Sequence, residues 1–358
     1  MSSIPHSSEK ENIYYARHLR LPGFTITTQD KLRNAKVLII GMGGLGCPAA
    51  RYLAGAGVGS LVLCDADTVS ITNLHRQILY TEKDVGQKKV DVAKEAICEA
   101  NPYIQVSVID SALDTSSLDT LIPQFDVVLD GTDNFDAKYA INDACEKYKV
   151  PLVYGSIFQF EGQVSVFHYP TDGTPDGFSF RDVYPSPPPA ALAQNCGEAG
   201  VIGVLPGIVG LLQANEVIKV ITGLGQPLAG NLLVFDALTA LSRQLPISKQ
   251  TRSQKETSIP ELSFESLQDL IKKDTNVLLV DVRDLNEREV GHLGGLHIPL
   301  LELPNHLATL KEAKSLILYC KSGVRSAQGF LYLETVLPNV PIKCLKGGVD
   351  GAACGISM

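Results

Sequence analysis

The chain has 358 residues, more than one hydrophobic core usually contains, and this length predicts two domains. Its formal net charge of −8 and pI near 5.4 exclude a surface built to neutralise phosphate backbones or anionic lipid, so neither nucleic acid nor a membrane is an expected partner. Residues 1–30 lack the apolar stretch of a signal peptide, and no later apolar run reaches the length of a membrane span, which predicts an uncleaved, cytoplasmic protein.

Residues 1–12 are polar and serine-rich and are expected to form a flexible tail. The apolar run 36–41 then predicts a buried parallel strand that ends in glycine. Residues 47–56 predict a helix, and the apolar run 61–65 predicts a second strand. Together these elements form a βαβ unit, the building block of a Rossmann-like fold.

The alternation of helices and strands continues to residue 246. Helices are predicted over 88–100, 142–149 and 207–221, and strands over 105–109, 125–130, 153–155, 162–169 and 232–236, the last being the final strand of the domain. A proline-rich crossover lies at 185–189. Because the strands after residue 151 are expected to extend the sheet in antiparallel fashion, residues 13–246 predict one α/β domain with a mixed sheet.

Residues 247–260 contain few apolar side chains and predict a solvated linker. Beyond them, the apolar runs 278–281 and 316–319 predict buried parallel strands, with helical stretches between and after them. Residues 261–358 therefore predict a second, smaller α/β domain.

A glycine-rich turn, GMGGLG over residues 41–46, joins the first strand to the first helix. Gly41, Gly43 and Gly44 are candidate nucleotide-binding residues, because glycines let backbone N–H groups approach a phosphate at a helix N-terminus. Asp65, at the end of the next strand, is placed to bind a ribose hydroxyl. Since this pattern suits NAD as well as ATP, an NAD-dependent oxidoreductase is an alternative.

Polar and cationic residues that follow the second strand favour ATP. The candidates in chain order are Thr72, Asn73, Arg76, Gln77 and Lys89. A polyphosphate under attack needs fixed positive charge beside it, whereas hydride transfer does not. The segment DGTDN, residues 130–134, follows another buried strand, at the sheet edge where such folds bind ligands. Asp133 is the candidate magnesium ligand there, and Asn134 stands beside it.

These motifs together resemble the MoeB/ThiF family, which belongs with the ubiquitin-activating enzymes, and more closely its MoeZ-type members with an added rhodanese domain. The resemblance covers nearly the whole chain and includes YARHL at 15–19, GMGGLG, NLHRQ at 73–77, GQKK ending at Lys89, and DGTDN. It implies that ATP or its magnesium is contacted by Gly44, Asp65, Asn73, Arg76, Lys89 and Asp133. Arg17 would reach across a homodimer into the partner's site. Thr72 stands where the family usually has serine, and this change keeps the hydroxyl.

Each of these residues also has an ordinary structural interpretation. Arg17 and Arg76 could form surface ion pairs, Lys89 could be solvated on its helix, and Asn73 could be a helix cap. Their order and spacing, taken together, favour the functional interpretation.

The eight cysteines include no C-x-x-C pair, which disfavours disulfides and a zinc knuckle and predicts mostly inert, buried thiols. Cys196 lies in a glycine-flanked loop after the prolines. The resemblance makes it a candidate for an acyl thioester or acyl disulfide, and a half-buried structural thiol is an equal alternative. Many relatives bind zinc through two C-x-x-C pairs, but here the corresponding stretch reads SFRD at 179–182, so no zinc is predicted.

Cys320 ends a predicted strand and opens the sequence CKSGVR, which runs to Arg325 before a helix predicted over 327–337. Several backbone N–H groups, the helix dipole and Arg325 are expected to stabilise a thiolate or persulfide there. Tyrosine phosphatases place five residues between cysteine and arginine, and the four found here fit a sulfane sulfur better than a phosphate. Together with DVR at 281–283 and GH at 291–292, this loop resembles a rhodanese, in which Cys320 carries the persulfide. The tail departs from the rhodanese pattern, because the chain has no tryptophan and its final helix is expected to be short.

The resemblance implies a complete reaction. ATP with Mg²⁺ would adenylylate the C-terminal Gly-Gly of a ubiquitin-like sulfur-carrier protein of the MoaD or ThiS kind, and the Cys320 persulfide would then convert it to a thiocarboxylate, directly or through Cys196. The sulfur donor would be thiosulfate or the persulfide of a cysteine desulfurase. The carrier's pathway, whether molybdopterin, thiamine, cysteine or tRNA thiolation, stays open. A non-catalytic scaffold that binds carrier and nucleotide is the second alternative.

Overall fold

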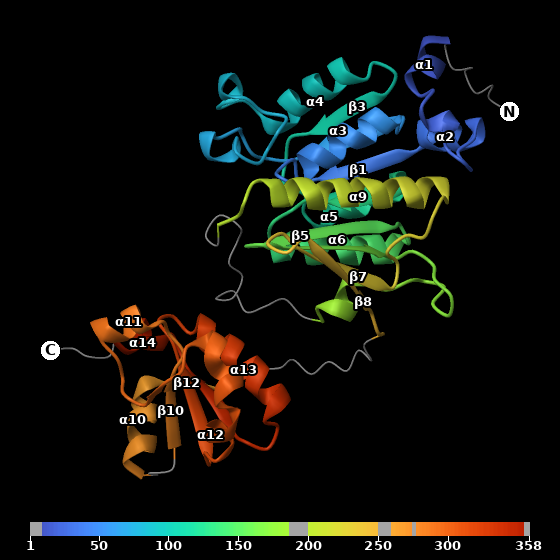
Figure 1. Ribbon diagram of the computed structural model, residues 1–358. Helices are drawn as coiled ribbons and strands as arrows, with labels where there is room; N and C mark the ends of the chain where they lie inside the picture. The colour runs from blue at the N-terminus through green and yellow to red at the C-terminus, as the bar shows by residue number, and fades with distance from the viewer. Residues whose placement is uncertain (1–8, 186–199, 250–258, 274–276, 354–358) are drawn as a thin grey trace. The chain divides into compact units, whose positions relative to one another are not determined.

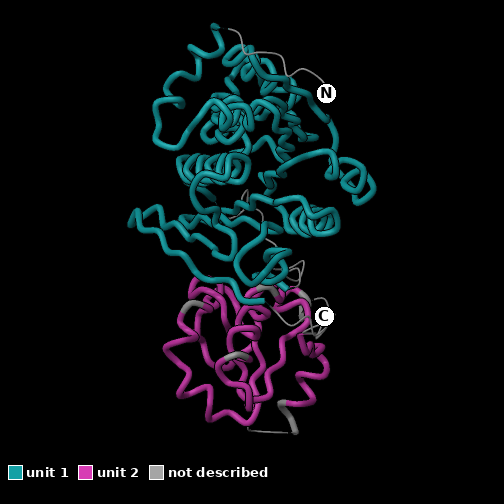
Figure 2. The backbone as a smooth tube through the Cα atoms, turned by 90° about the vertical axis from the view of Figure 1, so that its right-hand side faces the viewer, with its two compact units in different colours: residues 1–187, 195–252 teal, residues 188–194, 253–358 magenta. Residues whose placement is uncertain are grey.

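The computed structural model describes residues 9–185, 200–249, 259–273 and 277–353. The chain divides into two compact units, residues 1–187 with 195–252 and residues 188–194 with 253–358, which Figure 2 colours separately. Each unit has its own sheet and its own apolar core.

The first unit is built on an eight-stranded sheet with the order β3-β2-β1-β4-β5-β6-β7-β8. The strands are β1 (Lys36–Ile40), β2 (Ser60–Cys64), β3 (Gln105–Ile109), β4 (Val127–Asp130), β5 (Leu152–Phe158), β6 (Glu161–Phe167), β7 (Asn231–Asp236) and β8 (Leu241–Pro246). Neighbouring strands from β3 to β5 pair in parallel and those from β5 to β8 pair antiparallel, which confirms the predicted mixed sheet. Because β1 lies between β2 and β4, the loops after β1 and β4 adjoin at a topological switch point.

Helices cover both faces of this sheet (Figure 1). One face packs against α2 (Ile26–Asn34), α3 (Gly46–Ala56), α4 (Lys89–Ala100) and α9 (Val204–Thr222). The other face packs against α5 (Thr115–Leu121), α6 (Phe135–Tyr148) and α7 (Phe180–Val183). The helix α1 (Glu9–Tyr14) and the short 3-10 helices η1 (His18–Arg20), η2 (Ile71–Asn73), η3 (Glu82–Asp84) and η4 (Ile122–Gln124) lie in the connections.

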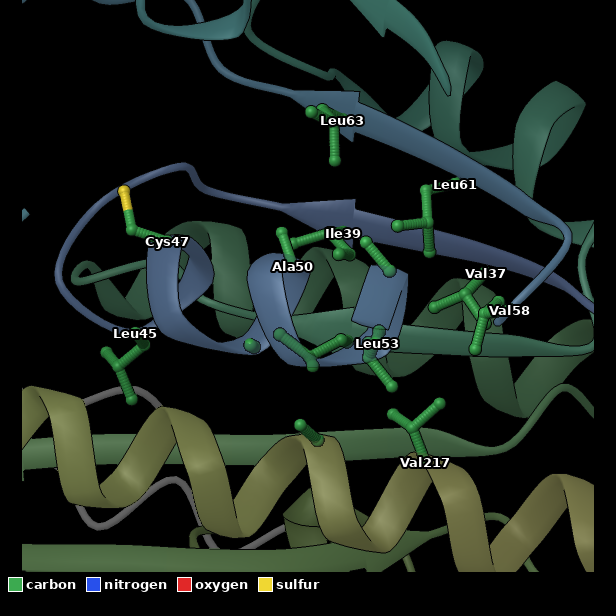
Figure 3. Close-up of a cluster of buried hydrophobic side chains, with 14 of the residues drawn as sticks. Val37, Ile39, Leu45, Cys47, Ala50, Leu53, Val58, Leu61, Leu63 and Val217 are labelled. Carbon is green, nitrogen blue, oxygen red and sulfur yellow. The ribbon is translucent and has the colours of Figure 1, made fainter. Parts of the chain in front are cut away.

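Alternate residues of the central strand point to opposite faces. Val37 and Ile39 of β1 lie in one core cluster with Leu53 of α3 and Val217 of α9, as Figure 3 shows. Leu38, between them in the sequence, lies in the cluster on the opposite face. β1 is thus buried on both faces, which is why its continuous apolar run predicts a parallel strand.

Helix α9 has 19 residues, and its mean hydropathy over an 18-residue window is 1.5. It is therefore long and apolar enough to cross a membrane. The expectation from the sequence that no segment reaches this length is therefore wrong. In the structure α9 packs against α3 and the central strands, and it buries Gln213 and Glu216 near its middle. These contacts are those of the core helix of a globular domain.

Two other elements differ from the sequence-based expectations. β7 is not the last strand, because β8 pairs antiparallel with it along its whole length. All β8 residues are exposed, so no apolar alternation marks this strand in the sequence. Helix α6 begins at Phe135 and not at Asn142, because the Asn134 side chain accepts the Ala137 N–H and caps the helix there.

The second unit contains a five-stranded parallel sheet with the order β11-β10-β12-β13-β9. Its strands are β9 (Glu261–Leu262), β10 (Val277–Asp281), β11 (Leu296–His297), β12 (Ser315–Tyr319) and β13 (Ile342–Leu345). Its helices are α10 (Phe264–Lys273), α11 (Leu285–Val290), α12 (Leu307–Lys311), α13 (Val324–Val336) and α14 (Gly348–Ala353), with the 3-10 helix η5 (Leu300–His306). Helices pack on both faces of the sheet, so both predicted strands of this unit are buried.

Candidate functional site

The glycine loop after β1 is crowded on one side and open on the other. Gly41 has φ of 95°, and a Cβ there would lie 2.7 Å from the carbonyl group of Gly131. A Cβ on Gly46 would overlap the carbonyl oxygen of Gly41. At Gly43, by contrast, the nearest atom to such a Cβ is the Gln77 Nε2 at 3.7 Å. The loop is therefore tightly packed against the β4 loop but leaves room above Gly43.

Asp65, which follows β2, holds this loop from the side. Its carboxylate accepts the N–H of Met42 at 2.7 Å and the N–H of Asp67 at 2.8 Å. Lys89, at the start of α4, places Nζ 2.7 Å from the Asp67 carboxylate and 3.9 Å from that of Asp65. The Lys89 side chain is 6% exposed and that of Asp67 is 71% exposed. Asp65 and Lys89 thus lie close together, and Asp67, which no sequence motif indicated, binds the Lys89 ammonium.

Arg76 and Gln77 reach the same loop from the turn after η2. Both backbone N–H groups donate to the Asn73 carbonyl at 3.0 Å. Arg76 Nη1 donates to the Thr72 carbonyl at 3.0 Å, and Arg76 Cδ lies 3.6 Å from the position of a Cβ on Gly44. Gln77 is buried, and its Oε1 has no hydrogen-bond partner within the described part of the chain. A buried amide oxygen without a partner is costly, and a bound ligand would supply one.

Asn73 and Thr72 make local contacts with Ser70. The Asn73 Oδ1 accepts the Ser70 N–H at 3.1 Å, and the hydroxyl oxygens of Thr72 and Ser70 lie 3.1 Å apart. Asn73 therefore caps η2, as the structural interpretation of this residue expects, and this cap fixes the turn that carries Arg76.

The N-terminus of α9 borders the glycine loop. Pro206 Cβ lies 2.9 Å from the position of a Cβ on Gly44, and a Cβ on Gly203 would overlap the His75 carbonyl. Farther along the helix, a Cβ on Gly210 would lie 2.8 Å from Cγ of Pro48 in α3. These close approaches place the positive end of the α9 dipole beside the glycine loop, where it favours an anion.

A buried ion pair fixes the loop that follows β4. Lys138 of α6 donates to the Asp130 carboxylate at 2.8 Å and to the Gly155 carbonyl at 2.8 Å. The other Asp130 oxygen accepts the N–H and the hydroxyl of Thr132 at 2.9 and 2.6 Å. Asp133, the next residue, is exposed beyond this fixed turn. One carboxylate beside a triphosphate suits Mg²⁺, which keeps waters and takes its other ligands from the phosphates.

Arg17 lies away from these residues within its own chain. It precedes η1 and is exposed. Its neighbour Tyr15 has its ring against Gly57, directly after α3, and His18 lies 3.0 Å from Gln29, whose amide donates to the Ala56 carbonyl. Since the glycine loop is at the other end of α3, about 15 Å of helix separates them.

Cys320 directly follows β12, and its thiol is buried. Its Sγ accepts the Gly323 N–H at 3.1 Å and lies 3.7 Å from the Ser326 hydroxyl. Gly323 has φ of 98° and turns the chain into α13. The backbone carbonyl of Cys320 accepts the Val349 N–H of α14 at 2.9 Å. The predicted arrangement of strand, thiol loop and helix is therefore present.

Arg325 is bound by two carboxylates that the sequence analysis did not single out. Its guanidinium donates to both oxygens of Glu287, at 2.5 and 2.7 Å, and to Asp284 at 3.3 Å. Hydrogen bonding by Arg325 lowers the pKa of Glu287, and the carboxylate in turn raises the pKa of Arg325. The positive charge that was expected to act on Cys320 is thus largely compensated. The capping box Asp284-x-x-Glu287 was the sequence signal for this acidic pair.

The DVR and GH motifs lie together in the same unit. Arg283 donates to the Asp281 carboxylate at 2.7 Å and to the Gly291 carbonyl at 2.9 Å. Asp281 and Arg283 are buried, so this pair ties the end of β10 to the residue before His292.

Four other described cysteines are buried. Burial raises the pKa of Cys47, Cys64 and Cys344 to about 12 and raises that of Cys145 still further. These thiols are therefore protonated at neutral pH, as predicted. Cys196 and Cys354 lie outside the described residues.

Residues 179–182 are joined to the rest of the unit by polar contacts. The Asn142 Oδ1 accepts the N–H of Phe180 at 2.9 Å and lies 2.9 Å from Nε2 of His168. Asp182 pairs with Lys249 at 3.1 Å. Within the described ranges, no three His, Cys, Asp or Glu side chains form a group that could hold a metal ion.

Residues 15–257 match the model of the ThiF family, and residues 263–353 match that of the Rhodanese-like domain. The chain belongs to the ThiF family. The predicted resemblance and fold class are thereby confirmed, and this ThiF-family chain carries the predicted rhodanese domain after its first unit.

Two curated relatives match this ThiF-family chain along nearly its whole length, and a third matches about two thirds of it. It is 38% identical over 346 residues to the "Probable adenylyltransferase/sulfurtransferase MoeZ" of Mycobacterium tuberculosis, a match that covers 90% of this chain and 88% of the relative. It is 35% identical over 376 residues to the "Adenylyltransferase and sulfurtransferase MOCS3" of Drosophila willistoni, covering 94% and 81%. A third relative, the "Sulfur carrier protein adenylyltransferase" of Thermus thermophilus, is 43% identical over 238 residues, covering 66% and 88%.

Solved structures share the fold of the first unit. The microcin C7 biosynthetic enzyme MccB in complex with N-formylated MccA aligns with a TM-score of 0.60 at 23% identity, covering 69% of this chain and 76% of MccB. PaaA aligns with a TM-score of 0.55 at 26% identity, covering 69% and 77%. These likenesses show the fold alone.

Proposed function

We propose that this protein adenylylates the C-terminal Gly-Gly of a ubiquitin-like sulfur-carrier protein and transfers sulfur to it from a persulfide on Cys320. It is thus an adenylyltransferase and a sulfurtransferase. The observation that carries this proposal is the convergence of two cations, Arg76 and Lys89, on a glycine loop at the switch point of the sheet. The names of the relatives from M. tuberculosis, T. thermophilus and D. willistoni agree with it.

In the first half-reaction, the carrier carboxylate attacks the α-phosphorus of ATP, and the bond from this phosphorus to the bridging oxygen breaks. Arg76, Lys89 and the N–H groups of the glycine loop stabilise the charge that moves to the leaving pyrophosphate. Asp65 binds the ribose, and Thr72, Asn73, Gln77 and Asn134 line the nucleotide site. Mg²⁺, held by Asp133 and the phosphates, would neutralise part of the triphosphate charge. The product is an acyl-adenylate.

In the second half-reaction, the terminal sulfur of the Cys320 persulfide attacks the acyl carbon, and AMP leaves. The carrier is then joined to Cys320 through an acyl disulfide. Two thiols of an external reductant cleave the sulfur–sulfur bond and are oxidised to a disulfide, which releases the thiocarboxylate and restores the Cys320 thiol. A route through an acyl thioester on Cys196 is the variant of this step.

The quaternary arrangement completes the nucleotide site. We expect a homodimer in which Arg17 of one protomer reaches the triphosphate of the other, because its own glycine loop is a helix length away. We also propose a cytoplasmic location and the following division of the chain: an adenylyltransferase domain over 13–246, a linker over 247–260 and a rhodanese domain over 261–358.

The experiment that tests the function separates its halves. The purified protein should catalyse ATP–pyrophosphate exchange only when a Gly-Gly carrier is present, and Lys89→Ala and Asp133→Ala should abolish the exchange. Cys320→Ser should keep the exchange but form no thiocarboxylate, as read from the carrier mass. Absence of carrier-dependent exchange by the wild-type protein would support the scaffold alternative, and exchange that survives Asp133→Ala would contradict the role of Asp133. Binding of nicotinamide without pyrophosphate release would support an oxidoreductase.

A further inference from the structure

The loop after Cys320 carries two cations whose surroundings differ. Lys321 is exposed and forms no ion pair with any residue that the structure describes. Arg325 is engaged by both oxygens of Glu287 and by Asp284. Among the described residues, an anionic sulfur donor that approaches Cys320 therefore meets Lys321, which has no ion-pair partner there, and Arg325, which carboxylates already neutralise.

Helix α11 holds Glu287 in place. Glu287 is the third residue of this helix, and its carboxylate accepts the Asp284 N–H at 3.4 Å while Asp284 caps the helix. A carboxylate fixed by a capping box loses less side-chain freedom on pairing than a free surface residue. The Glu287–Arg325 pair is therefore preorganised beside the Cys320 loop.

The pair is also within reach of a donor. The side chains of Arg325 and Glu287 are 26% and 30% exposed, so a solute can compete with Glu287 for the guanidinium. Thiosulfate is a dianion and would have to displace the Glu287 carboxylate in order to bind Arg325. This displacement is costly, because a guanidinium group binds a bidentate carboxylate strongly.

We propose that Glu287 sets the donor preference of the Cys320 loop by neutralising Arg325, so that the loop disfavours dianionic thiosulfate and accepts sulfur from a persulfide on a protein cysteine. This inference rests on the proposed sulfurtransferase function and names its donor class. With either donor, the Cys320 thiolate attacks the sulfane sulfur and forms a new sulfur–sulfur bond. Sulfite leaves with the bonding electrons in the first case, and the donor thiolate leaves in the second.

The test compares Glu287→Gln with Glu289→Gln in the full chain. Glutamine keeps the acceptor of the capping box and removes the charge of the bidentate partner, which leaves Asp284, at 3.3 Å, as the carboxylate that still contacts Arg325. Glu289 lies exposed on the same helix with no ion pair among the described residues, so its variant changes the net charge equally. Thiocyanate formation from thiosulfate and cyanide is the readout, because it needs neither ATP nor a carrier.

Glu287→Gln should lower the KM for thiosulfate roughly three- to five-fold with little change in kcat, the size expected for one partly exposed charge pair. The gain should shrink at high ionic strength and should be smaller for monoanionic methanethiosulfonate. Arg325→Met introduced into Glu287→Gln should remove the gain. A purely structural role for Glu287 would not make the effect depend on donor charge.

The outcomes separate the two levels of the proposal. If the wild-type protein forms no Cys320 persulfide with any donor, the sulfurtransferase function itself is wrong. If wild-type turnover is present but Glu287→Gln and Glu289→Gln behave alike with thiosulfate, only the role of Glu287 is wrong.

Discussion

Gly43 and Gly55 differ in what surrounds them, although both positions have room for a methyl group. Gly43 faces the open side of the nucleotide loop, with Gln77 Nε2 as its nearest neighbour, and Gly55 lies within α3 with no atom in reach. A methyl group at Gly43 should therefore leave the fold intact but occupy space where the triphosphate approaches.

We expect Gly43→Ala to reduce kcat/KM for ATP by about ten- to a hundred-fold without loss of stability. Gly55→Ala should keep full activity and raise stability by about 0.5–1 kcal/mol, because alanine is a better helix former. Carrier-dependent exchange kinetics and thermal melts of both variants provide the measurements. Equal activity of the two variants would place the triphosphate elsewhere.

His168 makes the first unit sensitive to acid. Burial lowers its pKa to about 4, with Glu146 and Asp143 opposing this effect and Lys249 adding to it. Because an unfolded histidine binds a proton near pH 6.5, the unfolded state takes up protons first as the pH falls. The free energy of unfolding should therefore fall on acidification, by on the order of 2 kcal/mol between pH 7.5 and pH 5.

The variant His168→Asn should remove this contribution while tolerating the left-handed backbone at this position, where φ is 55°. Urea unfolding at the two pH values gives the measurement. The stability of the variant should change less with pH than that of the wild type, and an unchanged difference would mean that another group titrates.

Helix α9 couples packing to the proposed nucleotide site. Its Gly210 adjoins Pro48 of α3, and its first turn adjoins Gly44. A methyl group at Gly210 has no room and should push α9 away from α3, whereas Gly207, on the same helix, has no atom within reach of a Cβ.

We expect Gly210→Ala to lower the free energy of unfolding by about 1–3 kcal/mol through overpacking. It should also weaken ATP binding, because Pro206 moves with the helix. Gly207→Ala should raise stability by somewhat less than about 1 kcal/mol. Denaturant melts and nucleotide titrations of both variants test this coupling, which is absent if Gly210→Ala binds ATP normally.

Elements with an apolar pattern could be predicted from the sequence. β3 occupies its predicted residues, and β1 and α3 differ by one residue, because burial leaves a periodic signal. The exposed strand β8 leaves no such signal, since backbone pairing with β7 forms it. The start of α6 was missed because Asn134 had been considered only as a nucleotide ligand, not as a cap.

The same distinction holds for the site. Gly41 and Asp65 could be predicted together because they follow the ends of two neighbouring parallel strands, which lie at one edge of the sheet, and Lys89 begins the helix that follows the second of these strands. The pairing of Arg325 with Glu287 could not, because 38 residues separate them and only the folded loop brings them together.

The proposed dimer makes each nucleotide site depend on both protomers. Arg17→Ala and Asp133→Ala should each be inactive in adenylylation alone. When the two proteins are mixed and allowed to exchange subunits, half of the dimers are mixed, and each mixed dimer has one site with both native residues. Activity should then recover to about a quarter of the wild-type value in an isologous dimer.

Carrier-dependent exchange, measured before and after mixing, gives the test. The control is a mixture of Asp133→Ala with Lys89→Ala, two residues of the same protomer's site, which should not recover. Lack of recovery by the first mixture, with subunit exchange shown independently, would mean that Arg17 serves its own chain or none.

In the proposed reaction, the contact between Lys89 and Asp67 would influence both nucleotide binding and product release. An incoming triphosphate does not meet a bare ammonium but must take it from a carboxylate, so weakly charged anions such as acetate gain little by entering. When pyrophosphate leaves, the Lys89 ammonium would pair with Asp67 again. Release of this product would therefore not leave the ammonium without a counter-charge. An acidic side chain beside an anion-binding site would thus limit how tightly the site holds the leaving pyrophosphate.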